Sequence, residues 1–499
     1  MRRELLIYLI GPLIVMALGL GACHRQEQAK ISRPIPKVWD EVAMASFELP
    51  LADPGIVLRH ASADEYYRIR ERTIWKSYPV YAPGKEPPDY MAWLEEQEPE
   101  IVFDPTKLHT DEDWIKAGEI VFDAPITFNE LAGVRSVQDP AWYEKNKVPV
   151  AADGTVPFIR YVIREQGNVE IGDFSCAMCH IRVMPDGSTI KGAQGNFPFG
   201  SVFASGLPTN ISIEILRKTN MQLFSAPWVK NDPHSRLDQM SMEEIVAAYE
   251  ALPAGVIPRF GSSIFYPPQV PDLIGVKDRH YLDHTGLMRQ QSPEDLMRYS
   301  SIVQGVDILD RFGSHIPVAN APEPENMSRY SDAQLYALAL YVYSLQPPPN
   351  PNKFDDLAKR GQEIFNRERC GGCHTPPLYT NNALMPVEGF KPPPESQRKF
   401  AIMPIALDTD PNLTLNTRRG TGYYKVPSLK GLWYRSPLEH NGSIATLEDW
   451  FDKRRLRNDY VPTGFRGAGV KNRPVKGHLY GLDLSLEDRK ALIAFLRTL

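Results

Sequence analysis

The sequence predicts a mainly α, loop-rich protein built from two tandem domains. The motif Cys-x-x-Cys-His occurs twice, with starting cysteines at positions 176 and 370. Each copy lies between two segments in which apolar residues recur at helical spacing. Proline accounts for 45 of the 499 residues, about 9% against a usual 5% or so, which indicates long, stiff loops. A chain of this length is enough for two or three domains.

The first residues have the pattern of an export signal. Arg2 and Arg3 precede an apolar run from Leu5 to Ala22, which is typical of a secretory signal peptide. Cys23 directly follows small residues, as in a bacterial lipobox, so we expect residues 1–22 to be cleaved and Cys23 to be lipidated. The mature protein would then be periplasmic or on the outer face of a bacterial membrane. The alternative is an uncleaved signal anchor, because such a run could just span a bilayer.

Charge argues against a nucleic-acid partner. The formal net charge is -5, and acidic and basic residues are mixed along the chain. A basic stripe or polybasic tail, the usual electrostatic feature of a nucleic-acid-binding protein, is missing from the sequence.

The two cysteine motifs predict two covalently bound c-type haems. They read Cys176-Ala-Met-Cys179-His180 and Cys370-Gly-Gly-Cys373-His374. Thiols three residues apart lie about one helical turn apart, close enough to bond the two vinyl groups of one porphyrin. The histidine that follows can bind the iron from the same side as the proximal ligand.

The four motif cysteines could instead serve one of three other roles. Structural disulfides occur in exported proteins, but they give no reason for a histidine after each pair. A four-cysteine zinc site usually has its pairs only about 15–20 residues apart. A thioredoxin-type redox pair requires a βαβ context, which the sequence does not show.

The elements of the first domain follow in order. Residues 23–105 are punctuated by proline, and we expect them to wrap the first haem domain. That domain is predicted to span residues 106–347. Asp111 to Phe122 is its opening helix and Ser331 to Leu345 its closing helix. The long insertions between them are expected to cover the haem.

The second domain is predicted to span residues 354–499. The proline-rich spacer 346–352 stops the preceding helix and separates the two domains. Phe354 to Phe365 shows helical periodicity just before the second motif. The last residues, Ser485 to Leu499, begin with a capping box and carry an apolar face.

The chain resembles the bacterial di-haem cytochrome c peroxidase superfamily, and within it the rubber-oxygenase-like branch. One block runs from Tyr424-Lys-Val-Pro-Ser-Leu to Glu-His440-Asn-Gly-Ser. Another comprises Pro271-Asp-Leu-Ile-Gly and Tyr281-Leu-Asp-His284-Thr-Gly. The resemblance covers residue 106 to the C-terminus and is thinnest between 190 and 260. It implies two cytochrome c-like domains, but these blocks occur in enzymes with different reactions.

For the second haem the candidate sixth ligands are His478, Met403 and His440. The resemblance places the distal ligand shortly before the closing helix, where this chain has His478. A bis-histidine haem, with a lower potential than a His/Met haem, is therefore expected. His440 is expected near the haem edge as a hydrogen-bonding group. The alternative for His478 is a solvated loop histidine.

For the first haem the sequence shows no comparable sixth ligand. The resemblance implies an open or labile distal face, where peroxide or dioxygen would bind. His284 could act there as an acid or base, or it could only cap a turn through its neighbours. The resemblance also leaves open a calcium ion, which some relatives hold between their domains.

These observations support two main hypotheses. In the first, the protein is an oxidoreductase, peroxidase-like or oxygenase-like, with peroxide or dioxygen chemistry at the first haem and electron transfer at the second. In the second, it is a non-catalytic, membrane-tethered electron-transfer cytochrome. A structural haem protein within a respiratory complex is a third, weaker hypothesis. The first two imply a redox partner protein, which the sequence does not identify.

Overall fold

The computed structural model describes residues 34–230, 232–237, 239–318 and 328–499. The expected signal peptide and Cys23 lie outside these residues. Residues 34–499 form one compact unit. The chain is 35% helical and 13% strand. It is therefore a mixed, loop-rich structure, with more strand than the predicted mainly α fold.

A membrane-spanning helix would have to be long and apolar. In the part of the chain that the structure describes, no helix meets both conditions.

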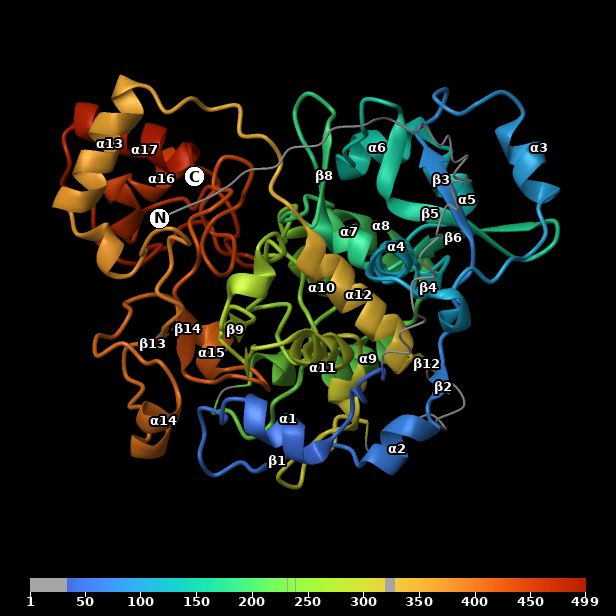
Figure 1. Cartoon of the computed structure of the whole chain (residues 1–499), viewed down its shortest axis with the longest axis horizontal. Helices are drawn as coiled ribbons and strands as arrows, with labels where there is room; N and C mark the ends of the chain where they lie inside the picture. The colour runs from blue at the N-terminus through green and yellow to red at the C-terminus, as the bar shows by residue number, and fades with distance from the viewer. Residues whose placement is uncertain (1–33, 231, 238, 319–327) are drawn as a thin grey trace, which may run out of the picture. The chain divides into compact units, whose positions relative to one another are not determined.

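The four helices expected around the two motifs are confirmed. α4 (Asp111–Asp123) packs against α12 (Asp332–Ser344), and α13 (Asp356–Arg367) packs against α17 (Leu486–Arg497) (Figure 1). Each helix begins with an oxygen-bearing side chain that accepts a hydrogen bond from the first turn. These capping residues are Thr110, Ser331, Asp355 and Ser485.

The two helix pairs cross at equivalent glycines. A Cβ atom built on Gly118 of α4 would lie 2.0 Å from the carbonyl oxygen of Ala337 in α12. One built on Gly361 of α13 would lie 2.0 Å from the carbonyl oxygen of Ala491 in α17. Both separations are far below van der Waals contact, so only glycine permits these helices to approach so closely.

A four-stranded antiparallel sheet was not foreseen. Its strand order is β3 (Ser77–Tyr81), β5 (Thr155–Glu165), β6 (Asn168–Asp173) and β4 (Thr127–Phe128). β4, β5 and β6 come from the region between α4 and the first motif, which the sequence suggested was loop, whereas β3 comes from the N-terminal segment. β6 ends two residues before the motif begins, so the hairpin of β5 and β6 leads directly into it.

The N-terminal segment forms further strand pairs with the first half of the chain. β1 (Leu58–Arg59) pairs with β11 (Arg311–Phe312), and β2 (Arg70–Glu71) pairs with β12 (Ser328–Arg329). β3 belongs to the four-stranded sheet. The wrapping of the first haem domain by residues 23–105 remains a prediction, which these pairings support.

The remaining elements connect these parts. The helices are α1 (Glu41–Phe47), α2 (Ala63–Arg68), α3 (Tyr90–Glu95), α5 (Val134–Val137), α6 (Pro140–Asn146), α7 (Cys176–His180), α8 (Phe199–Asn210), α9 (Ile213–Phe224), α10 (Met242–Glu250), α11 (Pro293–Val303), α14 (Pro394–Lys399), α15 (Asn412–Leu415) and α16 (Leu447–Trp450). The strands form the pairs β7 (Ile181–Val183) with β8 (Thr189–Lys191), β9 (Tyr281–Leu282) with β10 (Met288–Arg289), and β13 (Leu384–Pro386) with β14 (Tyr423–Lys425). Short 3-10 helices lie at η1 (Pro105–Lys107), η2 (Pro233–Arg236), η3 (Val276–Asp278), η4 (Val306–Leu309), η6 (Cys370–Gly372) and η7 (Lys453–Leu456).

A buried ion cluster joins the N-terminal segment, the first half and the second half of the chain. Arg419 pairs with Glu48 at 2.8 Å and also with Asp307 and Asp310. Its side chain is only 1% exposed. His60 bridges two of the same carboxylates, with Nε2 2.8 Å from Glu48 and Nδ1 3.1 Å from Asp310. Buried charges of this kind are tolerated only when they are paired, so the cluster fixes three distant segments together.

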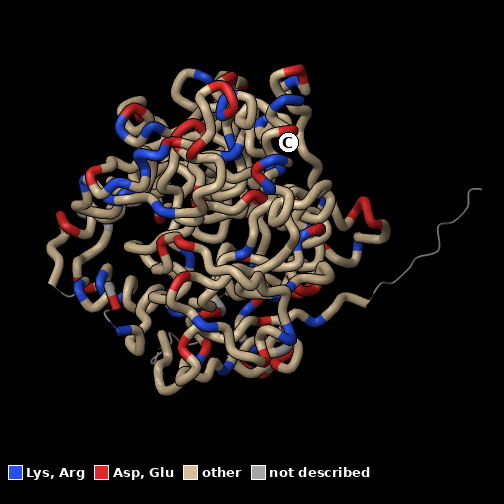
Figure 2. The backbone as a smooth tube through the Cα atoms, turned by 90° about the vertical axis from the view of Figure 1, so that its left-hand side faces the viewer, with Lys and Arg blue, Asp and Glu red and all other residues tan. Residues whose placement is uncertain are grey.

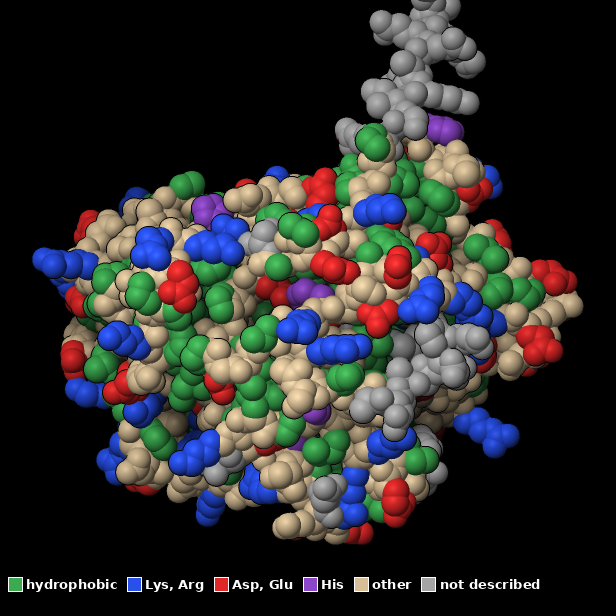
Figure 3. Space-filling view, turned by 90° about the horizontal axis from the view of Figure 1, so that it is seen from below, with side chains coloured by type: hydrophobic (Ala, Val, Ile, Leu, Met, Phe, Trp, Pro, Cys, Tyr) green, Lys and Arg blue, Asp and Glu red, His purple; other side chains and the backbone are tan. Residues whose placement is uncertain are grey.

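Charges of both signs are interspersed on the surface. Figure 2 shows lysine and arginine positions alternating with aspartate and glutamate positions over the side that it presents. The face in Figure 3 likewise mixes acidic, basic and apolar side chains. This distribution agrees with the mixed charge of the sequence.

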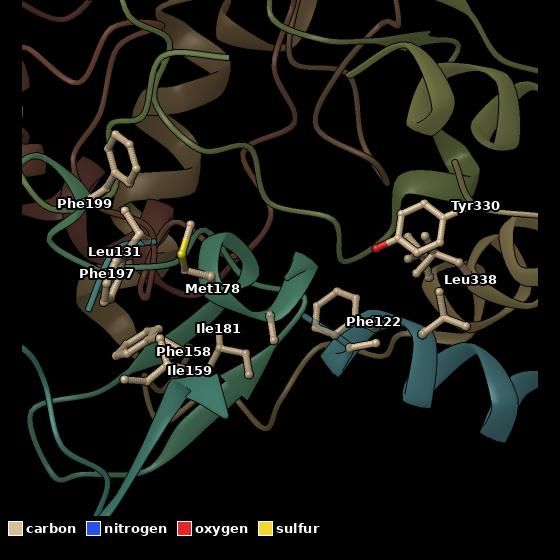
Figure 4. Packing of buried hydrophobic residues seen from close by; sticks show 14 of the residues in the cluster. Phe122, Leu131, Phe158, Ile159, Met178, Ile181, Phe197, Phe199, Tyr330 and Leu338 are labelled. Carbon is tan, nitrogen blue, oxygen red and sulfur yellow. The ribbon is translucent and has the colours of Figure 1, made fainter. Parts of the chain in front are cut away.

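The apolar core divides into one large cluster and several smaller ones. The large cluster surrounds the first motif, and Figure 4 shows Met178 and Ile181 near Phe158 of the sheet. A separate cluster contains Phe365 and Phe495 and lies against the second motif at Cys370. Each motif therefore has its own apolar surroundings. The predicted domain boundary between 347 and 354 remains a prediction.

The helix crossing predicts an unusual response to alanine. Gly361→Ala should destabilise the protein by about 2 kcal/mol, because the added methyl overpacks the contact with Ala491. Glycine to alanine inside a helix is otherwise stabilising by up to about 1 kcal/mol. Urea unfolding of both proteins measures the difference. Gly133→Ala is the control, since a methyl there meets nothing within 4 Å. An unchanged midpoint for Gly361→Ala would contradict the close contact.

The ion cluster predicts how stability depends on pH. Burial alone would lower the pKa of His60, but its hydrogen bonds to Asp310 and Glu48 raise that pKa to about 10. Because the folded pKa exceeds the unfolded value of about 6.5, the stabilisation is complete below pH 6.5 and is lost as pH rises through 10. The stability gap between the native protein and His60→Gln should shrink by roughly 3–4 kcal/mol over that window.

Thermal melts between pH 6 and pH 10 test this. The exposed His109→Gln variant is the matched control and should follow the native curve. A gap that stays constant with pH would show that His60 is neutral in the folded protein.

Candidate functional site

The first motif forms a single turn of helix that packs against β5 of the sheet. α7 consists of the motif itself, and the hydroxyl of Ser175 caps it by accepting a hydrogen bond from the Met178 amide at 3.1 Å. Burial raises the pKa of both thiols, Cys176 and Cys179, to about 12. The two thiols and His180 thus come from one turn of chain, as the spacing predicts.

The second motif is held by a 3-10 turn after α13. The amide of His374 donates to the carbonyl of Cys370 at 2.9 Å, which closes the turn and brings the histidine beside the cysteines. Cys370 packs against the apolar cluster of α13 and α17.

Both motif histidines are oriented in the same way. Nδ1 of His180 donates to the carbonyl of Pro271 at 3.1 Å, and Nδ1 of His374 donates to the carbonyl of Pro427 at 3.1 Å. A carbonyl can only accept, so Nδ1 carries the proton and Nε2 is left as a metal ligand. Burial lowers the pKa of His180 to about 4 and also lowers that of His374. Both rings are therefore neutral, the form that binds iron.

His478 lies across the second motif from His374. The two ring centroids are 6.5 Å apart. Two metal–nitrogen bonds of about 2 Å, plus about 1.2 Å from each nitrogen to its ring centre, would put the centroids about 6.4 Å apart. Burial lowers the pKa of His478 to about 4, and its Nδ1 is buried without a hydrogen-bond partner. The separation is compatible with His374 and His478 together holding one iron.

The imidazoles of His374 and His478 line a cavity of about 420 Å³. Its wall contains both motif thiols, Cys370 and Cys373, and is largely apolar. Apolar walls, two thiols at one edge and two neutral imidazoles fit a c-type haem. That His478 is the sixth ligand remains a prediction, which its 6.5 Å ring separation from His374 supports.

The two other candidate ligands also line this cavity. The sulfur of Met403 accepts a hydrogen bond from Asn381 at 3.3 Å, which competes with metal binding. His440 donates from Nδ1 to Glu439 at 2.7 Å and stacks on Tyr424, while its Nε2 is buried without a partner. His440 is therefore on the cavity wall, where a hydrogen-bonding group beside the haem was expected.

His284 lies on the wall of the second cavity, although it was considered for the distal face of the first haem. Its Nε2 donates to the carbonyl of Gln269 at 2.8 Å, and burial lowers its pKa to about 4. Nε2 is thus engaged by a carbonyl, and Nδ1 is the acceptor nitrogen of the neutral ring. The neighbouring Asp283 bonds the backbone and side chain of Thr285 and pairs with Arg259 at 2.7 Å, which favours the turn-capping alternative.

The two halves carry an internal repeat that sequence analysis missed. Val-Pro-x-Leu occurs at 270–273 and 426–429, and His284 and His440 each follow the proline of their own copy by 13 residues. The amide of Gln269 donates to the carbonyl of His440 at 2.8 Å, and the amide of Lys425 donates to that of His284 at 2.9 Å. Equivalent positions thus exchange hydrogen bonds between the halves. The equal spacing of 13 residues between proline and histidine in both copies is the sequence signal that could have revealed this repeat.

Two of the other interpretations of the cysteines find no support. None of the four motif cysteines forms a disulfide. Across the described ranges, no group of three or more histidine, cysteine, aspartate or glutamate side chains is placed to hold one metal ion. The calcium ion remains untested.

Comparison with known proteins gives only distant likenesses. No family model and no curated protein matches the chain. Hydrazine synthase of Kuenenia stuttgartiensis, in a crystal pressurised with xenon, is 16% identical with a TM-score of 0.29, over 58% of this chain and 89% of that chain. A MauG-like protein associated with microbial copper homeostasis is 14% identical with a TM-score of 0.29, over 57% and 87%. At these values the likeness assigns neither a family nor an activity.

The axial pair predicts a change in redox potential. His478→Met should raise the midpoint potential of the second haem, because a thioether ligand favours ferrous iron more than an imidazole does. Spectroelectrochemical titration measures it. The exposed His280→Met variant, away from the cavity, is the control. An unmoved potential would assign the sixth position to another group, such as Met403.

Proposed function

We propose that the protein is an exported di-haem c-type cytochrome with peroxide or dioxygen chemistry at the first motif and electron transfer at the second. The observation that carries the proposal is the 6.5 Å separation of His374 and His478 across an apolar cavity beside two thiols. The repeat of the proximal-histidine arrangement at His180 extends the proposal to a second haem.

The second site is suited to electron transfer. A haem bound there supplies an iron that gains or loses one electron at a time. His374 and His478 would occupy both axial positions, which leaves none for a substrate. The apolar wall excludes water, so the surroundings need little rearrangement when the charge changes.

The first site differs in what faces its histidine. Among the residues that the structure describes, no second imidazole forms a ring contact with His180. Both ring nitrogens of His234, a buried histidine of the first half, are engaged, by Asp232 at 2.9 Å and Ser263 at 3.0 Å. An open sixth position is what binding of peroxide or dioxygen requires.

One short segment links the two sites. The carbonyl of Pro271 accepts the hydrogen bond of His180, and Gln269, Pro271 and Asp272 line the cavity of the second site. An electron could therefore pass from one site to the other through a hydrogen bond and a few covalent bonds. This arrangement supports cooperation of the two sites in a single reaction.

The remaining parts of the proposal concern location and partners. Lipidation of Cys23 would tether the protein to the outer face of a bacterial membrane or in the periplasm. A redox partner protein, as yet unidentified, would exchange electrons with it.

Electron paramagnetic resonance of the oxidised protein tests the proposal. We expect one high-spin ferric signal, which cyanide converts to low spin, and one low-spin signal that does not change when cyanide is added. Cys176→Ala should weaken attachment at the first site and lose the high-spin signal, whereas Cys373→Ala should lose the low-spin signal. Haem content of each variant, measured as the pyridine haemochrome, accompanies the spectra.

Two results would overturn parts of the proposal. Two low-spin haems that bind neither cyanide nor peroxide would leave only the alternative, a membrane-tethered electron carrier. Unchanged haem content in both cysteine variants would rule out covalent attachment at the motifs.

A further inference from the structure

Positive charge exceeds negative charge on the wall of the second cavity. The charged lining residues are Arg279, Arg369, Lys425 and Arg435, against Asp272 and Glu439. Glu439 is already engaged by His440 at 2.7 Å. The wall thus has a formal excess of two positive charges.

Three of these cations form a group. Lys425 ends β14, Arg279 follows η3 and Arg435 lies in the loop after the Val-Pro-Ser-Leu segment. Burial, together with the proximity of Arg279 and Arg435, lowers the pKa of Lys425 to about 7. All three side chains are half-buried. Holding an excess of positive charge partly out of water is costly, so an anion that binds there is indicated.

Some hydrogen-bond donors of these three cations have no good acceptor among the described residues. Lys425 Nζ donates to the carbonyl of Tyr281 at 3.4 Å, a long contact for an ammonium. Arg435 donates to the carbonyls of Ser428 and Lys430, but its Nε is buried with no partner. Arg279 donates to the carbonyls of Asp272 and Ile274. Its nearest carboxylate oxygen, on Asp272, is 3.9 Å away.

We infer that Lys425, Arg279 and Arg435 bind the two propionate carboxylates of the haem at the second motif. The inference rests on the proposed function, because it requires a haem in this cavity. A porphyrin of this type carries two carboxylates, which match the excess of two positive charges. Arginine and lysine make charge-assisted hydrogen bonds to carboxylates. The cations therefore also fix which edge of the porphyrin faces the first half of the chain.

Lys425→Met tests the inference through the midpoint potential of the second haem. Without the cation, the carboxylate charge favours ferric iron, so that potential should fall. Lys425→Arg keeps the charge and should restore it. The potential of the first haem is an internal standard, and the exposed Lys430→Met in the same loop is the matched control.

A second readout does not depend on the potential. In resonance Raman spectra, the propionate bending bands of Lys425→Gln should shift relative to those of the native protein, because a hydrogen bond to the carboxylate is changed. Either this shift or the fall in potential supports the inference.

The outcomes separate this inference from the proposed function. Two attached haems, with a second-haem potential unchanged in Lys425→Met and propionate bands unchanged in Lys425→Gln, would overturn the inference alone. A native protein that contains no haem by the pyridine haemochrome assay would overturn the proposed function, and the inference with it.

Discussion

The exchange of backbone hydrogen bonds between the two halves is the constraint on which the candidate site depends. The amides of Gln269 and Lys425 each bond the histidine carbonyl of the other half. This exchange places the two Val-Pro segments side by side, and each segment provides the carbonyl that orients one motif histidine. The orientation of both proximal ligands therefore follows from one interface. The second half would not complete its site alone, since Gln269, Pro271 and Asp272 of the first half line the second cavity.

A cluster of buried charges also joins the two halves of the chain. Arg418 and Arg419, both almost fully buried, pair with Asp307, and Arg419 also reaches Glu48 and Asp310. These pairs join segments more than 100 residues apart in sequence. Removing one partner of such a pair leaves an uncompensated charge, which costs about 3–5 kcal/mol. In the ion cluster the charges are matched within the chain, whereas in the second cavity cations are in excess. That contrast distinguishes a structural cluster from a binding site.

Elements with strong local signals could be predicted from the sequence. The helices around the motifs have clear caps and apolar periodicity, and the structure confirms α4, α12, α13 and α17. The sheet was missed because β3 and β5 are about 75 residues apart, and alternation in β5 was weak evidence without its partners. The position of His284 was missed for a similar reason, since it depends on contact with the other half. Strand pairing and interface contacts are long-range properties that local patterns do not specify.

The sequence alone determined the chemistry that fits within one turn of chain. Two thiols and an imidazole must be close in sequence to serve one porphyrin edge, so their spacing shows them directly. Only the tertiary structure decided what faces each imidazole: His478, about 100 residues from His374, lies across the cavity, and the carbonyls of Pro271 and Pro427 set the ring orientations. The physical reason is that the opposite side of a planar cofactor is reached by a different segment, and its approach is fixed by packing of the whole chain.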